Sequence, residues 1–174
     1  MNSKDQNAFT YVECLLALVF LSIVLAPLLL AFPTGLHGTR LAKNITMANL
    51  LAEDLMDEIK SKRFDENTAE PFIGTLGYDG AEGSDLPSRI AFNDVDDYNN
   101  WPPTGITAPV DMEGLEIPEF TDFTREVVVE YVDYDDIDTW TVSSSIDTYY
   151  KIISIYVSGP YNPTIKLESI VSFH

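Results

Sequence analysis

The sequence is poor in the residues that form disulfides and most active sites. Its 174 residues include one cysteine, Cys14, and two histidines, His37 and His174. A lone cysteine forms no internal disulfide, so a folded domain must be held together by its core alone. Catalytic constellations usually combine Cys, Ser or His side chains at matched positions, and these residues do not assemble into one. We therefore expect a protein that is not an enzyme.

Positive charge is scarce in the second part of the chain. Residues 64–174 contain 22 acidic and four basic side chains, which gives a net charge of −18, whereas residues 1–63 hold six of each sign. A domain this acidic repels nucleic acids and anionic lipid headgroups. The composition disfavours nucleic acid as a partner. It suits either solubility in a cation-rich medium or pairing with a basic neighbour.

Near the N-terminus, charge is missing altogether over a long apolar run. The 19 residues from Cys14 to Phe32 carry no charged side chain. As a helix they would span about 28 Å, close to the ~30 Å hydrocarbon core of a bilayer. The run ends in Leu28–Pro33 without the small residues that a signal peptidase needs, and Cys14 precedes the run instead of following it as in a lipoprotein. The sequence predicts a transmembrane helix over residues 9–32.

One carboxylate, Glu13, lies at the start of this apolar run. An ionised Glu near hydrocarbon costs up to roughly 2.5–3.5 kcal/mol, so its position calls for a partner or a purpose. Two interpretations are open. Glu13 has a partner that neutralises it, or it is an exposed interfacial Glu among the lipid headgroups.

The residues around Glu13 form a recognisable motif, Ala8-Phe9-Thr10-Tyr11-Val12-Glu13. The motif resembles the N-terminus of type IV prepilins and type II secretion pseudopilins. Phe9, Thr10 and Glu13 match that family in type and spacing, whereas Ala8 stands where the family usually has Gly.

The resemblance implies a leader over residues 1–8, which a prepilin peptidase cuts between Ala8 and Phe9 on the cytoplasmic side. It also implies methylation of the new amine of Phe9 and an ion pair between Glu13 of one subunit and the amine of its neighbour. The partners would be that peptidase, other pilin or pseudopilin subunits, and the membrane. The chain would cross the bacterial inner membrane once, with the N-terminus in the cytoplasm and the C-terminal domain outside, and would enter a pilus or pseudopilus.

Beyond the run, residues 33–63 predict a second helical segment. Pro27, Pro33 and Gly35 are helix-weakening residues, so we expect a kink or short break near Pro33; a simple loop there is the alternative. An apolar stripe at helical spacing follows, and it needs a partner surface. The stripe consists of Leu41, Ile45, Ala48, Ala52, Leu55 and Ile59.

That surface is predicted within residues 125–174. Alternating β-branched and aromatic residues indicate strands at Arg125–Val132, Tyr149–Val157 and Thr164–Phe173, with a turn-rich connector between the last two. The expected fold class is α+β, with a long N-terminal helix packed on a C-terminal antiparallel sheet. This is also the fold that the pilin resemblance implies.

Residues 64–124 hold six of the nine glycines and six of the ten prolines, so we expect loops there, with a short strand at Ser88–Phe92. In pilin-like proteins this is the variable region. The segment Phe92–Tyr98, the Trp101–Pro103 run and the segment Leu50–Lys62 resemble minor pilins related to mannose-sensitive haemagglutinin pilus accessory proteins.

Clustered carboxylates offer the weak signal of a metal site. Oxygen ligands of this kind suit calcium, but the clusters lack the glycine and distant glutamate of a helix-loop-helix calcium loop. We therefore expect no cofactor, with calcium as the alternative to a solvated acidic hairpin loop. The first cluster is Asp133, Asp135, Asp136 and Asp138, and the second is Asp94, Asp96 and Asp97.

Three functions remain open. The first is a minor pilin or pseudopilin that primes, caps or modifies a type IV pilus or a type II secretion pseudopilus. The second is a membrane-anchored, adhesin-like module that binds a ligand through the loops of residues 64–124, with Tyr78, Tyr98 and Trp101. The third is a plain membrane-anchored periplasmic protein.

Overall fold

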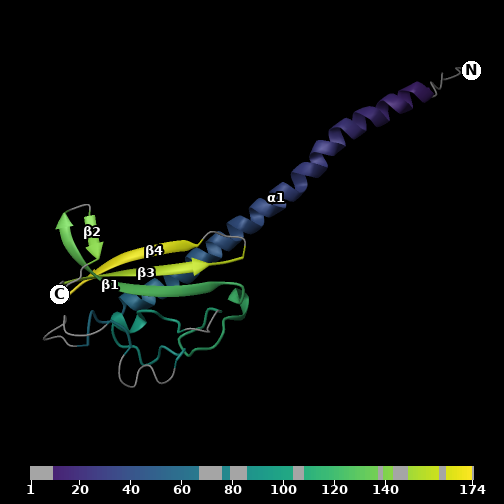
Figure 1. Cartoon of the computed structure of the whole chain (residues 1–174). Helices are drawn as coiled ribbons and strands as arrows, with labels where there is room; N and C mark the ends of the chain where they lie inside the picture. Colours follow the sequence, from purple (N-terminus) through teal and green to yellow (C-terminus); the bar gives the residue numbers. More distant parts are fainter. Residues whose placement is uncertain are drawn as a thin grey trace, which may run out of the picture. The chain divides into compact units, whose positions relative to one another are not determined.

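The computed structural model describes residues 10–66, 76–78, 86–103, 108–136, 139–142, 149–160 and 164–173, and of residues 133–136 and 139–142 it describes the backbone. The elements are helix α1 (Tyr11–Lys60), the short 3-10 helices η2 (Asp96–Tyr98) and η3 (Pro118–Phe120), and strands β1 (Thr124–Asp136), β2 (Thr139–Val142), β3 (Tyr150–Ser158) and β4 (Ile165–Ser172) (Figure 1). The chain divides into two compact units, Met1–Ala42 and Lys43–His174.

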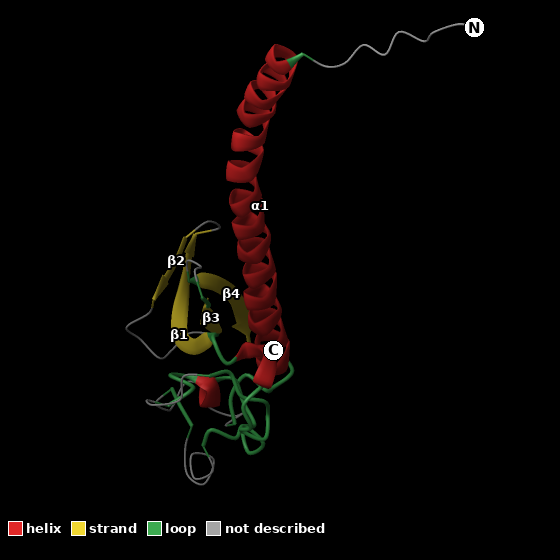
Figure 2. Ribbon diagram, turned by 90° about the vertical axis from the view of Figure 1, so that its right-hand side faces the viewer, coloured by secondary structure: helices red, strands yellow, loops and turns green. Residues whose placement is uncertain are grey.

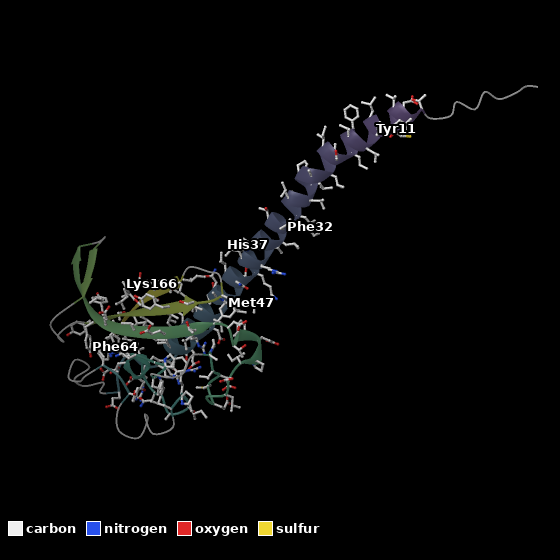
Figure 3. The ribbon with its side chains drawn as sticks, turned by 45° about the vertical axis from the view of Figure 1, so that its right-hand side comes forward. Tyr11, Phe32, His37, Met47, Phe64 and Lys166 are labelled. Atoms are coloured by element: carbon white, nitrogen blue, oxygen red, sulfur yellow. The ribbon has the colours of Figure 1, made fainter. Side chains whose placement is uncertain are left out.

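The described part of the first unit is helical from Tyr11 onward. Its side chains over residues 10–40, including those of Tyr11 and Phe32, are exposed and project around the helix (Figure 3). An exposed helix that is apolar on all sides is unfavourable in water. By its length and composition α1 is a candidate membrane span. This agrees with the predicted transmembrane segment.

The short break predicted near Pro33, and the loop predicted as its alternative, are wrong, whereas the predicted kink stays a prediction. Helix α1 continues through Pro27, Pro33 and Gly35, so Tyr11–Lys60, which covers most of the predicted segments 9–32 and 33–63, is one helix. A proline removes one backbone hydrogen bond and crowds the preceding turn, which bends a helix without necessarily ending it. The hydroxyl of Thr34 adds a bond to the carbonyl of Leu30 at 3.4 Å.

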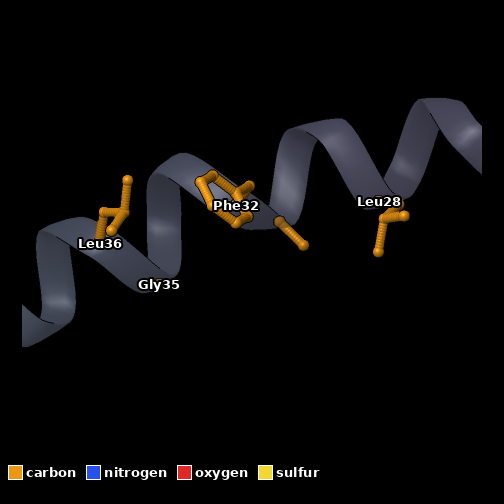
Figure 4. A pocket seen from close by; sticks show the side chains of 5 residues that line it. Leu28, Phe32, Gly35 and Leu36 are labelled. Carbon is orange, nitrogen blue, oxygen red and sulfur yellow. The ribbon is translucent and has the colours of Figure 1, made fainter.

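Gly35 leaves a shallow apolar groove on the surface of α1. The groove is lined by Leu28, Ala31, Phe32, Gly35 and Leu36, and Figure 4 shows the helical turns continuing past it. Nothing within 4 Å would meet a Cβ added at Gly35. The glycine is therefore accommodated as an ordinary helical residue, which is why it does not end the helix.

The sheet of the second unit is antiparallel, with the strand order β2-β1-β3-β4. Its central register pairs Val127 with Ile155, and Ile155 with Leu167. The three predicted strands are confirmed with small shifts of their ends. Strand β2 was not predicted, because four residues between acidic and serine-rich segments give little periodicity.

The part of α1 that belongs to the second unit runs beside this sheet (Figure 2). Its core residues are Ala48, Leu51, Ala52, Leu55, Met56 and Ile59, and they are buried together with Val127, Val129, Ile153, Ile155 and Val157 of the sheet. The predicted α+β fold is confirmed. The buried part of the predicted apolar stripe begins only at Ala48, because Leu41 is half-buried and Ile45 is exposed.

The described residues between α1 and β1 are mostly loops, as expected, yet they supply part of the core. Their buried apolar side chains are Phe92, Val95, Tyr98, Trp101, Val110 and Phe123. The predicted strand at Ser88–Phe92 is wrong. The amide of Phe92 donates to the carbonyl of Arg89 at 3.1 Å, which is a turn contact that an extended strand does not make.

Candidate functional site

The start of α1 contains a reciprocal set of hydrogen bonds between Thr10 and Glu13. The amide and the hydroxyl of Thr10 donate to Oε2 of Glu13 at 2.8 and 2.9 Å, and the amide of Glu13 donates to the hydroxyl of Thr10 at 3.4 Å. This is a capping box, in which the residue before the helix and the third helical residue satisfy each other's free backbone donors. A carboxylate also suits the positive end of the helix dipole.

The cap fixes where the Glu13 carboxylate lies without exhausting its bonding capacity. All three bonds involve Thr10, and both bonds to the carboxylate end on Oε2. Since a carboxylate offers about four lone-pair sites, Oε1 can accept a further donor. Thr10 was identified only as a motif match, although the Thr-x-x-Glu spacing is itself a signal for a cap. Ala8 and Phe9 lie outside the described residues.

The solvated loop predicted for the first carboxylate cluster is partly wrong. Asp133, Asp135 and Asp136 belong to β1, where Asp133 pairs with Thr141 and the register shifts between Tyr134 and Asp136, and Asp138 lies outside the described residues. Among the side chains that the structure describes, which do not include those of residues 133–142, no group of three or more His, Cys, Asp or Glu is arranged to hold a metal ion.

An ion pair between the buried Arg89 and the half-buried Glu58, which the sequence analysis missed, joins α1 to the loops. Nε and Nη2 of Arg89 each donate to a different carboxylate oxygen of Glu58 at 2.8 Å. The hydroxyl of Tyr98 donates to Oε1 of Glu58 at 2.7 Å. Burial raises the pKa of Glu58, but the hydrogen bonds and charge of Arg89 outweigh it and hold that pKa below its usual value. Glu58 therefore stays ionised inside the fold.

Trp101 lies beside this pair and contacts a second arginine. The guanidinium of Arg89 is 4.3 Å from the centre of the Trp101 ring, and that of Arg125 is 5.4 Å from it. Arg125 donates through Nη2 to the carbonyl of Val110, while its buried Nε and Nη1 have no partner among the described residues. Burial, with the nearby charge of Arg89, lowers the pKa of Arg125 to about 10. The negative charges of Glu58 and Asp54 and the face of the Trp101 ring oppose this effect and favour the charged form.

A second charged cluster surrounds Lys151 of β3, which is fully buried. Its Nζ donates to Asp96 at 2.8 Å, to Asp65 at 3.3 Å and to the carbonyl of Phe64 at 2.8 Å. These bonds attach the sheet to the end of α1 and to η2. Asp96, one of the three carboxylates of the second cluster, therefore has a structural role as a partner of Lys151.

Asp94 is the most strongly perturbed carboxyl of this cluster. Burial raises its pKa to about 8, and the neighbouring carboxylates of Asp96 and Asp97 contribute to the shift. The folded state thus keeps a proton on Asp94 that the unfolded chain loses near its ordinary pKa of 3.8. The resulting stabilisation is fully present below that value and disappears as the pH rises toward 8.

Asp94→Asn is expected to stabilise the protein at pH 8, because the amide imitates the protonated carboxyl and adds no charge. Since one pKa unit corresponds to about 1.4 kcal/mol, we expect a gain of roughly 1–3 kcal/mol in the free energy of unfolding at pH 8. At pH 4 the gain should nearly vanish. Thermal unfolding of the full chain in detergent between pH 4 and 9 measures both values.

Asp122→Asn is the matched control, since Asp122 is exposed and its replacement removes the same charge. A gain in the control equal to that of Asp94→Asn would attribute the effect to the net charge of the domain and contradict a buried, protonated Asp94.

Two of the three aromatic residues assigned to a ligand-binding surface are unavailable for that role. Tyr98 and Trp101 are 0% exposed, whereas Tyr78 is 38% exposed. The indole Nε1 of Trp101 donates to the carbonyl of Pro87 at 3.3 Å. Tyr98 and Trp101 act as core residues, which weakens the case for an adhesin-like module.

Comparison of the chain with models of known protein families, with curated proteins and with solved structures finds no match.

Proposed function

We propose that the chain is a minor pilin or pseudopilin, a subunit that primes, caps or modifies a type IV pilus or a type II secretion pseudopilus. A prepilin peptidase would remove residues 1–8 and Phe9 would be methylated. Helix α1 would anchor the subunit in the bacterial inner membrane before assembly, with the acidic domain outside.

The observation that carries this proposal is the position of Glu13. Its carboxylate lies in the first turn of a helix whose following residues are apolar and exposed, and Thr10 holds it there. A cap alone would explain a polar residue in this position in a soluble helix. Here the helix is a candidate membrane span, where an unpaired carboxylate is costly. An amine from a neighbouring subunit would neutralise it.

The fold supports the same proposal. A helix that is exposed and apolar at one end and packed on an antiparallel sheet at the other suits a subunit that joins others through its helix while its domain stays in water. The experiment that tests the proposal is the removal of the charge at Glu13, with incorporation into filaments as the readout.

A further inference from the structure

The loop before η3 forms a small hairpin over Pro109–Ile117, here called the acidic hairpin. The amide of Ile117 donates to the carbonyl of Pro109 at 3.0 Å, and that of Asp111 donates to the carbonyl of Leu115 at 2.8 Å. Gly114 occupies the turn with a φ of +87°, and a Cβ there would lie 2.9 Å from the backbone nitrogen of Ser88. The hairpin is therefore closed by its own backbone hydrogen bonds and lies against Ser88 at its turn.

The buried arginines hold the base of the acidic hairpin. Nη1 of Arg89 donates to the carbonyls of Val110 and Asp111 at 3.3 and 3.1 Å, and Arg125 also donates to the carbonyl of Val110. The amide of Arg89 donates to the carbonyl of Met112 at 2.8 Å. The ion pair with Glu58 thus connects the position of the hairpin to α1.

The surface of the acidic hairpin combines large apolar side chains with carboxylates. Leu115 is 66% exposed, and Met112 and the neighbouring Ile90 are also exposed. Glu113, which lies between Met112 and Leu115 in the sequence, and Glu116, which follows Leu115, are also exposed. A rigid surface with exposed apolar side chains and a charged rim is typical of a docking site.

The basic residues of segment 64–174 do not neutralise the negative charge of that segment. Of the four in residues 64–174, Arg89, Arg125 and Lys151 are buried. The fourth, Lys166, forms an ion pair with Glu168 at 2.5 Å. A partner of the opposite charge is therefore favoured, and an anionic surface is repelled.

We propose that the acidic hairpin docks a basic, amphipathic segment of another protein, with Lys or Arg side chains opposite Glu113 and Glu116 and an apolar side chain against Leu115. This interaction is separate from the proposed pairing of Glu13, since it uses the water-exposed domain and requires neither cleavage of the leader nor assembly of a filament.

The test measures binding of a synthetic amphipathic helical peptide, with Lys on one face and Leu beside it, to the full chain in uncharged detergent. Exposed ion pairs contribute about 0.2–1 kcal/mol each, so Glu113→Gln combined with Glu116→Gln should weaken binding roughly two- to thirtyfold. Leu115→Ser should weaken it by about ten- to a hundredfold, since one buried leucine contributes about 1.5–3 kcal/mol.

The matched control is Glu53→Gln combined with Asp57→Asn, which removes two exposed carboxylates from α1. Its binding should change less than twofold. Equal weakening by the control and the hairpin variant, or binding that does not saturate, would show unspecific attraction to the acidic domain and overturn the proposal. Self-association of the chain that depends on the hairpin would also overturn it, by assigning the surface to a second copy.

Discussion

Replacing Glu13 by Gln is expected to lower the amount of the chain in filaments by at least tenfold. Removing one partner of a buried ion pair costs about 3–5 kcal/mol, because the other charge is left unpaired. Each 1.4 kcal/mol corresponds to about a factor of ten in an equilibrium constant. The measurement is quantitative immunoblotting of sheared filaments and membranes from the bacterial host.

This substitution separates charge pairing from helix capping. Gln is also accepted at the third helical position of a capping box, so Glu13→Gln keeps the bonds to Thr10 but removes the charge. Thr10→Ala keeps the charge of Glu13 but removes the hydroxyl that bonds to it, at a cost of about 0.5–2 kcal/mol in helix stability. We expect Thr10→Ala to reduce incorporation less than Glu13→Gln does. Normal incorporation of Glu13→Gln would identify Glu13 as a helix cap only.

Glu58→Ala is expected to give the largest loss of stability. It would leave Arg89 buried and unpaired, and Tyr98 would lose the acceptor of its hydroxyl. We expect a loss of about 3–5 kcal/mol in the free energy of unfolding. For a domain of this size that corresponds to a fall in Tm of roughly 10 °C or more. Thermal unfolding of the full chain in detergent at pH 7 measures it.

Asp57→Ala is the matched control, because Asp57 is the exposed acidic neighbour of Glu58 on α1. Surface substitutions of this kind usually change stability by less than about 0.5 kcal/mol. Similar Tm values for the two variants would contradict a stabilising role for the buried pair.

Periodicity predicted the parts of the fold that depend on local pattern. The apolar stripe of α1 and the alternation in β1, β3 and β4 each arise from residues that share one face, so they can be read from spacing. The limit of this approach is visible at Pro33, where a local rule predicted a break. The rule considers only the backbone hydrogen bond that the proline removes. The remaining hydrogen bonds of α1 maintain the helix on both sides of Pro33.

The charged core was not predictable in the same way. Glu58, Arg89 and Arg125 are separated by 31 residues or more along the chain, and only the fold brings them together. Their residue types match those of solvated surface side chains, which is the usual environment of Glu and Arg. The same holds for Trp101, which in sequence resembles an exposed loop aromatic.

The candidate site at α1 was predictable, because its residues are adjacent. Glu13 was identified because it is a charged residue at the start of an apolar run. Its spacing from Thr10 is the sequence signature of a capping box. Its proposed partner belongs to another subunit, and that part of the account depends on the family resemblance.

The most direct measurement is the intact mass of the chain purified from its bacterial membrane, with sequencing of the N-terminal peptide by mass spectrometry. The account predicts a chain that begins at Phe9 and carries one methyl group on its terminal amine. A chain that keeps Met1 through Ala8 would contradict it, since Glu13 would then lack the processed amine with which it is proposed to pair.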